Sequence, residues 1–255
     1  MRIPELVVGH GPVRIIALHG WFGSASGWGL LPELVDRDAW SVAFLDARGY
    51  GARKDEPGPF TVEQVAADAL ALADQLAWDR FAVLGHSMGG VMALRVFADA
   101  PERITAVVGI SPVPASGVPL DDEGRTLFET AAQDDGARAT IIDLTTGGRQ
   151  SATWVRQVVD HSVEHSTREA FGAYLQSWAG ADFASELPTP TPPVPVSVVV
   201  GEHDPALGED TARATWLEQL PGARLDVLAG AGHYAMYETP VALLTSLEAT
   251  LTELR

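Results

Sequence analysis

The amino-acid sequence predicts an α/β fold: a mostly parallel, twisted sheet flanked by helices, with a helical cap inserted between two strands. Short runs rich in Val, Ile, Leu and Ala alternate with longer segments of helical periodicity, which is typical of βαβ units. One stretch, residues 112–193, has helical patterns but no convincing strand, and it begins and ends with proline-rich segments. Since α/β chains of 255 residues can form one domain, we expect a core from residues 1–111 and 194–255 and a cap from residues 112–193 with a proline-rich return linker.

The strands are expected where apolar residues run almost without interruption over four to seven positions. Such runs are typical of strands that are buried on both faces of a parallel sheet. In chain order they are Arg2–Val8, Arg14–Leu18, Ser41–Leu45, Phe81–Leu84, Ile104–Ile110, Val194–Val200 and Leu225–Leu228.

The clearest helix is expected to begin at Thr61. Gln64 follows three residues later, which is the spacing of a capping box, and apolar residues then recur every three or four positions. Other core helices are expected over Met88–Ala98, Thr211–Leu220 and Pro240–Leu254, and cap helices over Gly124–Gln133, Ala137–Leu144, Thr153–His165 and Arg168–Trp178.

Composition and charge exclude several classes of function. The chain has 17 Lys and Arg against 34 Asp and Glu, a net charge of −17, whereas nucleic acids and anionic membranes are bound by clustered cations. It has no cysteine, which excludes disulfides, thiol nucleophiles and iron–sulfur clusters. No apolar stretch could span a bilayer, and the run Leu6–Val8 is too short for a signal peptide. We expect a cytoplasmic protein that binds neither nucleic acid nor membrane.

A candidate nucleophile lies in the segment Gly85-His86-Ser87-Met88-Gly89-Gly90, which fits the pattern Gly-x-Ser-x-Gly. In this pattern the serine occupies a strained turn between a strand and a helix, and the glycines allow the two backbones to approach closely. The pattern alone is weak, because a glycine-rich turn can contain an incidental serine. Here an expected strand precedes it and an expected helix follows, so we assign Ser87 as the nucleophile.

A serine hydroxyl needs a base, and the base needs an acid that orients it. Asp204 follows the strand that ends near Val200, and His233 follows the strand that ends at Leu228, so both are expected at the sheet edge that carries Ser87. The order Ser87, Asp204, His233 is the serine–acid–histidine order of one class of hydrolase. Three alternative assignments remain open: Asp204 as the cap of a helix, Glu202 as the acid, and His233 as a surface residue.

Two further histidines, His161 and His165, are spaced so that they could share one helix face and hold a metal. The segment does not match the zinc-protease pattern, and the sequence offers no obvious third ligand. We expect no metal and no cofactor.

Acyl transfer also needs N–H donors for the negatively charged oxygen of the transition state. The backbone N–H that follows the nucleophile belongs to Met88, and a second donor is expected in an early strand-to-helix loop. His19-Gly20-Trp21-Phe22-Gly23 ends the strand Arg14–Leu18, and within it we favour the backbone N–H of Trp21.

With these segments the chain resembles the α/β-hydrolase superfamily, specifically its small capped serine esterase and haloperoxidase-like branch. The resemblance runs from about residue 14 to the C-terminus and rests on residues 19–23, Asp46-Ala47-Arg48-Gly49-Tyr50-Gly51, residues 85–90, Gly201-Glu202-His203-Asp204 and Gly232-His233. It implies an α/β-hydrolase fold and an acyl-enzyme mechanism with Ser87, His233 and Asp204. The loop after Gly51 departs from the family pattern, because Ala52 replaces the usual serine.

The resemblance implies a small-molecule ester as substrate. Dehalogenases and epoxide hydrolases of the family carry aspartate where Ser87 stands. A carboxylesterase acting on small to medium apolar esters is the first expectation. The alternatives are a lactonase, a carbon–carbon bond hydrolase, a cofactor-free perhydrolase or haloperoxidase, and a non-catalytic protein that binds a small ligand. Candidates for the substrate pocket are Trp21, Phe22, Trp28 and the cap aromatics Phe128, Trp154, Phe171, Tyr174 and Trp178, although ordinary packing also explains each cap aromatic. The sequence predicts no oligomeric state.

Overall fold

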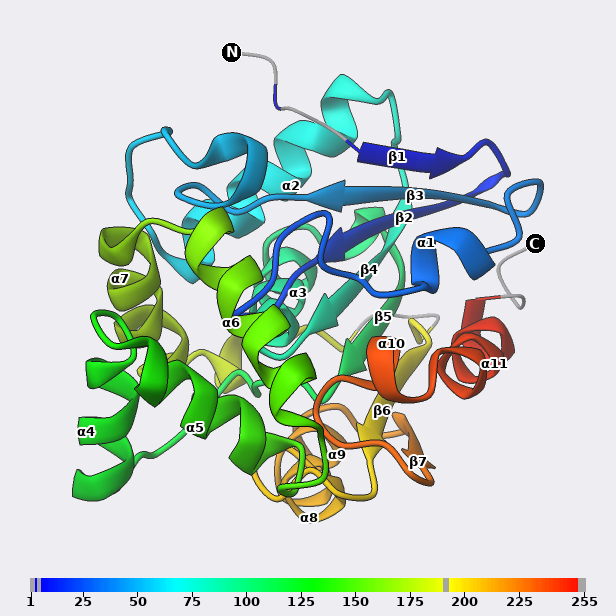
Figure 1. Ribbon diagram of the computed structural model, residues 1–255. Coiled ribbons are helices and arrows are strands. Elements are labelled where there is room, and N and C mark those ends of the chain that lie inside the picture. The colour runs from blue at the N-terminus through cyan, green and yellow to red at the C-terminus, as the bar shows by residue number, and fades with distance from the viewer. Residues whose placement is uncertain (1–2, 4–5, 190–192, 252–255) are drawn as a thin grey trace.

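The computed structural model describes residues 3, 6–189 and 193–251 (Figure 1). Seven strands form one sheet in the order β1-β3-β2-β4-β5-β6-β7. Only β1 is antiparallel to its neighbour, so the sheet is mostly parallel, as predicted. The strands are β1 (Leu6–Gly9), β2 (Val13–Leu18), β3 (Trp40–Leu45), β4 (Phe81–His86), β5 (Ile104–Ile110), β6 (Val196–Gly201) and β7 (Arg224–Leu228).

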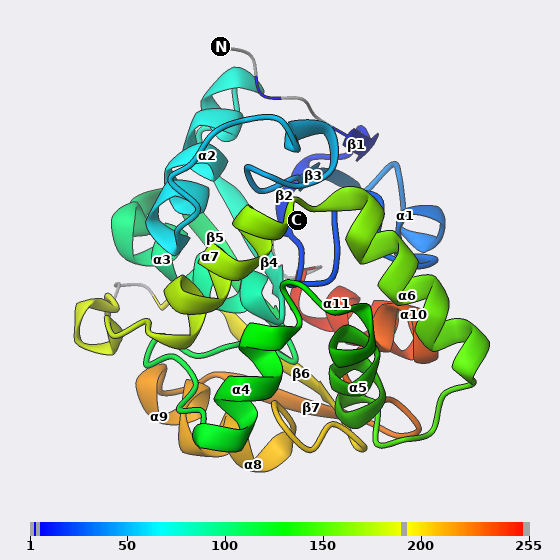
Figure 2. The ribbon, with the colours of Figure 1, turned by 60° about the vertical axis from the view of Figure 1, so that its left-hand side comes forward.

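Helices cover both faces of the sheet (Figures 1 and 2). Among them, α2 packs beside α3, and α1 packs beside α11. The core helices are α1 (Leu31–Leu34), α2 (Val62–Gln75), α3 (Met88–Asp99), α8 (Glu209–Ala214), α9 (Trp216–Gln219), α10 (Ala235–Glu238) and α11 (Pro240–Leu251). Three short 3₁₀ turns occupy Gly51–Arg53, Pro101–Arg103 and Ala184–Glu186.

Between β5 and β6 the described residues form four α-helices, which gather over the carboxyl ends of the strands (Figure 2). They are α4 (Asp122–Thr130), α5 (Asp135–Thr145), α6 (Ala152–His165) and α7 (Arg168–Ala179). Side-chain oxygens of Asp121, Asp134, Ser151 and Thr167 each accept a hydrogen bond from the N–H three residues later. Each of these residues therefore caps the helix that follows it.

The structure corrects two details of the sequence analysis. The single helix expected over Thr211–Leu220 is two short helices, because the backbone of Thr215 (φ −128°, ψ −79°) leaves the helical region. The capping box at Thr61 is half formed: its side chain accepts from the N–H of Gln64, while the Gln64 amide donates to Asp68 instead. Parts of three predicted segments lie outside the described residues. They are residues 2, 4 and 5 of the first expected strand, residues 190–192 of the proline linker and residues 252–254 of the last helix.

The order of the strands determines where a site can form. The chain passes from β2 to β3 on one side and then places β4 on the other side of β2. In such sheets ligands bind beyond the carboxyl ends of the strands at this point of reversal. The loop that begins at His19 follows β2, and Ser87 follows β4, so both lie there.

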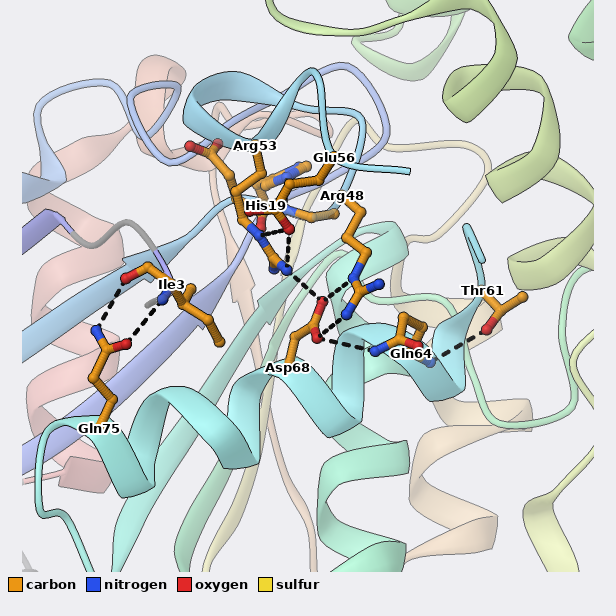
Figure 3. A network of polar contacts seen from close by, with 11 residues as sticks. Ile3, His19, Arg48, Arg53, Glu56, Thr61, Gln64, Asp68 and Gln75 are labelled. Carbon is orange, nitrogen blue, oxygen red and sulfur yellow. Dashed lines mark hydrogen bonds and ion pairs between the residues drawn. The ribbon is translucent and has the colours of Figure 1, made fainter. Parts of the chain in front are cut away.

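A buried ionic network holds the loop after β3 near this point. Asp68 on α2 accepts hydrogen bonds from Arg48 at 2.9 and 3.0 Å and from Arg53 at 2.8 Å (Figure 3). Burial acts to raise the pKa of Asp68, but the two arginines outweigh it and hold that pKa below its ordinary value. Asp46 in the same loop accepts from the N–H of Ala25 at 2.7 Å. The loop after β3 thereby supports the loop after β2.

Candidate active site

Ser87 lies at the sharp turn between β4 and α3. Its backbone angles (φ 53°, ψ −118°) are strained for a residue with a side chain. The turn is held because the N–H of Ser87 donates to Ile110 and its carbonyl accepts from Val113. A Cβ on Gly85 would lie 2.1 Å from the carbonyl oxygen of Gly89, so only glycine fits there. The fold therefore fixes the Ser87 hydroxyl at the carboxyl edge of the sheet.

Asp204 and His233 meet at the same edge. Nδ1–H of His233 donates to Oδ2 of Asp204 at 2.6 Å, and both residues are buried. The other carboxylate oxygen accepts from the N–H groups of Ala206 and Leu207, each at 3.0 Å. Burial acts to raise the pKa of Asp204, but His233 and these hydrogen bonds outweigh it, so the pKa lies below its ordinary value. Asp204 is therefore ionised, and Nε2 of His233 bonds no group among the described residues.

Ser87 and His233 line the same cavity, which has a volume of about 160 Å³. No hydrogen bond joins the Ser87 hydroxyl to the imidazole within the described residues. Such bonds are often long in the absence of substrate and shorten when it binds.

Of the two expected oxyanion donors, Trp21 lines this cavity, and Met88 directly follows Ser87, which lines it. Neither the N–H of Trp21 nor that of Met88 donates to an acceptor among residues 3, 6–189 and 193–251. The carbonyl of Trp21 accepts from the Tyr50 hydroxyl at 3.0 Å, and its indole N–H donates to the carbonyl of Phe171 at 2.8 Å. These contacts hold the backbone of Trp21 while its amide hydrogen stays available.

The cavity is almost entirely apolar. Within the described part of the chain, no Asp, Glu, Lys or Arg side chain lines it. Its lining comes from both core and cap and comprises Trp21, Phe22, His86, Ser87, Val113, Val118, Leu120, Phe128, Ile141, Leu144, Thr145, Trp178, Ala206, Leu207, His233 and Tyr234.

The aromatic candidates of the sequence analysis fall into three groups. Trp21, Phe22, Phe128 and Trp178 line this cavity, and Trp154 lines a second one beside it. Trp28 lies in the core against Phe44 and His86, outside both linings. Phe171 and Tyr174 are also fully buried, and Phe171 stacks on Trp21 with ring centroids 3.9 Å apart.

Glu238 also belongs to the site, and the sequence analysis did not predict it. Its buried carboxylate accepts from the N–H of Gly232 at 2.9 Å and from the N–H of Tyr234 at 3.0 Å, and so brackets His233. Gln150 of the cap donates to the same carboxylate at 2.7 Å. No local pattern indicates this role, because Glu238 ends a helix of only four residues.

The remaining acidic and histidine candidates lie apart from this arrangement. Glu202 is half exposed and accepts from the N–H of Gly230 rather than from His233. His161 and His165 stack with ring centroids 4.1 Å apart. In the described part of the chain, no group of three or more His, Asp or Glu side chains could hold a metal ion. None of its helices is long and apolar enough to cross a membrane.

Comparison with known proteins places the chain among hydrolases. The family described as alpha/beta hydrolase fold matches residues 13–240. The chain is 28% identical to the dihydrolipoyllysine-residue acetyltransferase component of the acetoin cleaving system of Cupriavidus necator, over 93% of this chain and 63% of that protein. It is 25% identical to the esterase YbfF of Escherichia coli over 96% and 95%. Among solved structures, the enol-lactonase from Burkholderia xenovorans superposes with a TM-score of 0.83 at 23% identity, covering 98% and 96%. The chain therefore spans a little less than two thirds of the first relative and nearly the whole of the other two.

Proposed function

The chain belongs to the alpha/beta hydrolase fold family, and we propose that it is a serine hydrolase that cleaves carboxylic esters through an acyl-enzyme intermediate. In this proposal Ser87 is the nucleophile, His233 the base and Asp204 the acid that orients it. The backbone N–H groups of Trp21 and Met88 form the oxyanion hole.

One observation carries the proposal: the imidazole of a buried carboxylate–imidazole pair lines an apolar cavity together with a serine on a strained turn. The 2.6 Å bond between Asp204 and His233 selects the tautomer in which Nε2 accepts a proton. A strained serine at the end of a strand is the arrangement that exposes its hydroxyl to a substrate.

The first half of the reaction forms the acyl-enzyme. Oγ of Ser87 attacks the ester carbonyl carbon while its proton passes to Nε2 of His233. The carbonyl oxygen becomes negatively charged and accepts from the two N–H groups, which have no other acceptor among the described residues. The bond to the alcohol oxygen then breaks, and that oxygen takes the proton from His233.

The second half releases the acid. A water molecule gives a proton to Nε2 of His233 and attacks the acyl carbon. The tetrahedral intermediate collapses, the bond to Oγ breaks, and Oγ recovers the proton. Serine and histidine thereby return to their starting states.

The cavity favours an uncharged, apolar acyl group. Its wall carries aliphatic and aromatic side chains, and a carboxylate placed in it would find no cation among the described lining residues. The net charge of −17 also disfavours anionic substrates. Esters of small to medium apolar acids fit both observations.

A lactone is the second candidate, because it is an internal ester that the same steps would open. The solved enol-lactonase from Burkholderia xenovorans has the same fold over nearly its whole length. A panel that contains esters and lactones of matched size would distinguish the two substrates.

The proposal is tested by labelling with a fluorophosphonate, followed by intact mass and peptide mapping. We expect one adduct, on Ser87, and none on the Ser87→Ala variant with an unchanged circular dichroism spectrum. A folded protein that forms no adduct would overturn the nucleophile assignment and favour a protein that only binds a small ligand.

A further inference from the structure

A second cavity, of about 230 Å³, lies beside the catalytic one. Among the described residues, the two cavities share Phe22, His86 and Tyr234 in their walls, so these side chains lie at their boundary. We call the second cavity the α6 chamber, because the rest of its wall comes from the loop after β2, from α6 and from Tyr237. None of the functions considered so far uses it.

The chamber differs from the catalytic cavity in chemistry. On α6, Gln157 and Val158 lie three and four residues after Trp154, and His161 lies four and three residues after them, so the four form one stripe that faces the chamber. Trp154 packs edge-on against Tyr234 and Tyr237, with ring centroids 5.5 and 6.0 Å apart. Among the described lining residues there is again no Asp, Glu, Lys or Arg, but here amide and imidazole groups accompany the aromatic rings.

The imidazole of His161 has one free ring nitrogen. Its Nε2 is hydrogen-bonded to the hydroxyl of Ser24 at 3.0 Å, and Nδ1 has no partner among the described residues. Burial, together with the neighbouring His165, lowers the pKa of His161 to about 4, so the ring is uncharged at neutral pH. Gln157 is exposed to solvent where it lines the chamber, and its amide bonds no other side chain or backbone group in the described part of the chain. The chamber thus offers two neutral hydrogen-bonding groups beside aromatic faces.

The chamber adjoins the catalytic cavity at Tyr234, which is next in the chain to His233. The leaving oxygen must come within reach of His233, which donates its proton. Tyr234, the next residue, forms part of the wall that the two cavities share. An alcohol portion longer than a few atoms would therefore extend toward the chamber, while the acyl portion stays among the apolar side chains.

We propose that the α6 chamber binds an uncharged, hydrogen-bonding alcohol portion of the substrate through Gln157 and His161. The preferred substrates are then esters that join an apolar acid to a neutral polar alcohol. The inference rests on the proposed ester hydrolysis and names its substrate class.

The test compares two butanoate esters whose alcohol portions have equal length: hexyl butanoate and the monobutanoate of diethylene glycol. The quantity measured is the ratio of kcat/KM for the polar ester to kcat/KM for the hexyl ester. We expect Gln157→Met and His161→Gln each to lower this ratio by about threefold to tenfold, the effect of one neutral hydrogen bond. His161→Gln keeps an amide near the position of Nε2, where it can still bond Ser24, and removes the group at Nδ1.

Asp160→Asn is the matched control, because Asp160 is exposed on the same helix and does not line the chamber. It should leave the ratio unchanged. A ratio that stays constant in both Gln157→Met and His161→Gln would overturn the proposal, and so would an equal loss for both esters.

A binding measurement distinguishes the proposal for the α6 chamber from the proposal of ester hydrolysis. In the Ser87→Ala background, calorimetry measures the affinity for the glycol ester without turnover. Affinity that falls in the Gln157→Met and His161→Gln variants supports the chamber even if the wild-type protein hydrolyses neither ester. Absent binding, or binding that the two variants do not weaken, overturns it whatever the fluorophosphonate result.

Discussion

The indole N–H of Trp21 donates to the backbone carbonyl of Phe171 at 2.8 Å, and the two rings stack with centroids 3.9 Å apart. Trp21 belongs to the loop after β2, whereas Phe171 lies on helix α7. The residue proposed as an oxyanion donor is thus bound directly to α7. A second contact, between Ser24 and His161, joins the same loop to α6.

Trp21→Phe should lower kcat about tenfold and change KM little, since it removes the bond that positions the backbone N–H and keeps an aromatic ring. Trp40→Phe is the control: that indole is buried in β3, and its N–H has no partner among the described residues. Steady-state kinetics on one ester checks both variants. Equal kcat values in the two would contradict a positioning role for the Trp21 indole.

Asp204→Asn should lower kcat about 10⁴-fold, because an amide at this position favours the wrong tautomer of His233. Glu202→Gln should lower kcat less than twofold, since Glu202 is half exposed and bonds Gly230 instead. Rates measured side by side would settle which carboxylate acts. A large loss in Glu202→Gln with a small one in Asp204→Asn would reverse the assignment.

Glu238→Gln should lower kcat about tenfold, because the amide can accept only one of the two N–H bonds that bracket His233. The free energy of unfolding should also fall by about 1–3 kcal/mol as one buried N–H loses its acceptor. Kinetics and urea denaturation measure the two effects. Unchanged kcat with reduced stability would show that Glu238 supports the fold alone.

The stability of the protein should fall as the pH drops below about 6.5. Burial, with the neighbouring His233, lowers the pKa of His86 from 6.5 to about 3, while its Nε2–H donates to the carbonyl of His233. Between these values the unfolded chain binds a proton that the folded protein does not, so stability rises with pH.

His86→Gln, which can still donate to that carbonyl, should reduce this slope by up to about 1.4 kcal/mol per pH unit. Urea denaturation between pH 4.5 and 6 measures it. Identical slopes in the two proteins would contradict the buried neutral imidazole.

Gly89→Ala should destabilise the protein by about 3 kcal/mol or more, because the new Cβ would lie 2.0 Å from the carbonyl oxygen of Leu18. Gly172→Ala, inside helix α7, meets only the Cβ of Ala132 at 3.5 Å and should stabilise by about 0.5–1 kcal/mol. Thermal unfolding of the pair checks the contrast. Equal effects would mean that α3 does not approach β2 as closely as described.

Much of the fold follows from local sequence patterns. Within the described residues, the strands and the helices α4 to α7 were predicted within a few residues, because each strand carries an apolar run and each helix its own apolar period. Exceptions are short elements such as α1 and α10, whose four residues are too few for a period. The break at Thr215 was also missed, since nothing in the neighbouring sequence marks it.

By itself the sequence determined which residues meet at the sheet edge, since the carboxyl ends of parallel strands share one side and Ser87, Asp204 and His233 each follow such an end. Only the tertiary structure decided what surrounds them. Trp21 bonds a residue 150 positions away, Glu238 brackets His233, and Trp28 turns into the core while Trp178 lines the cavity. Local sequence patterns indicate which residues are buried against neighbouring elements. They do not indicate which distant side chain fills a given space, because that depends on packing across the whole molecule.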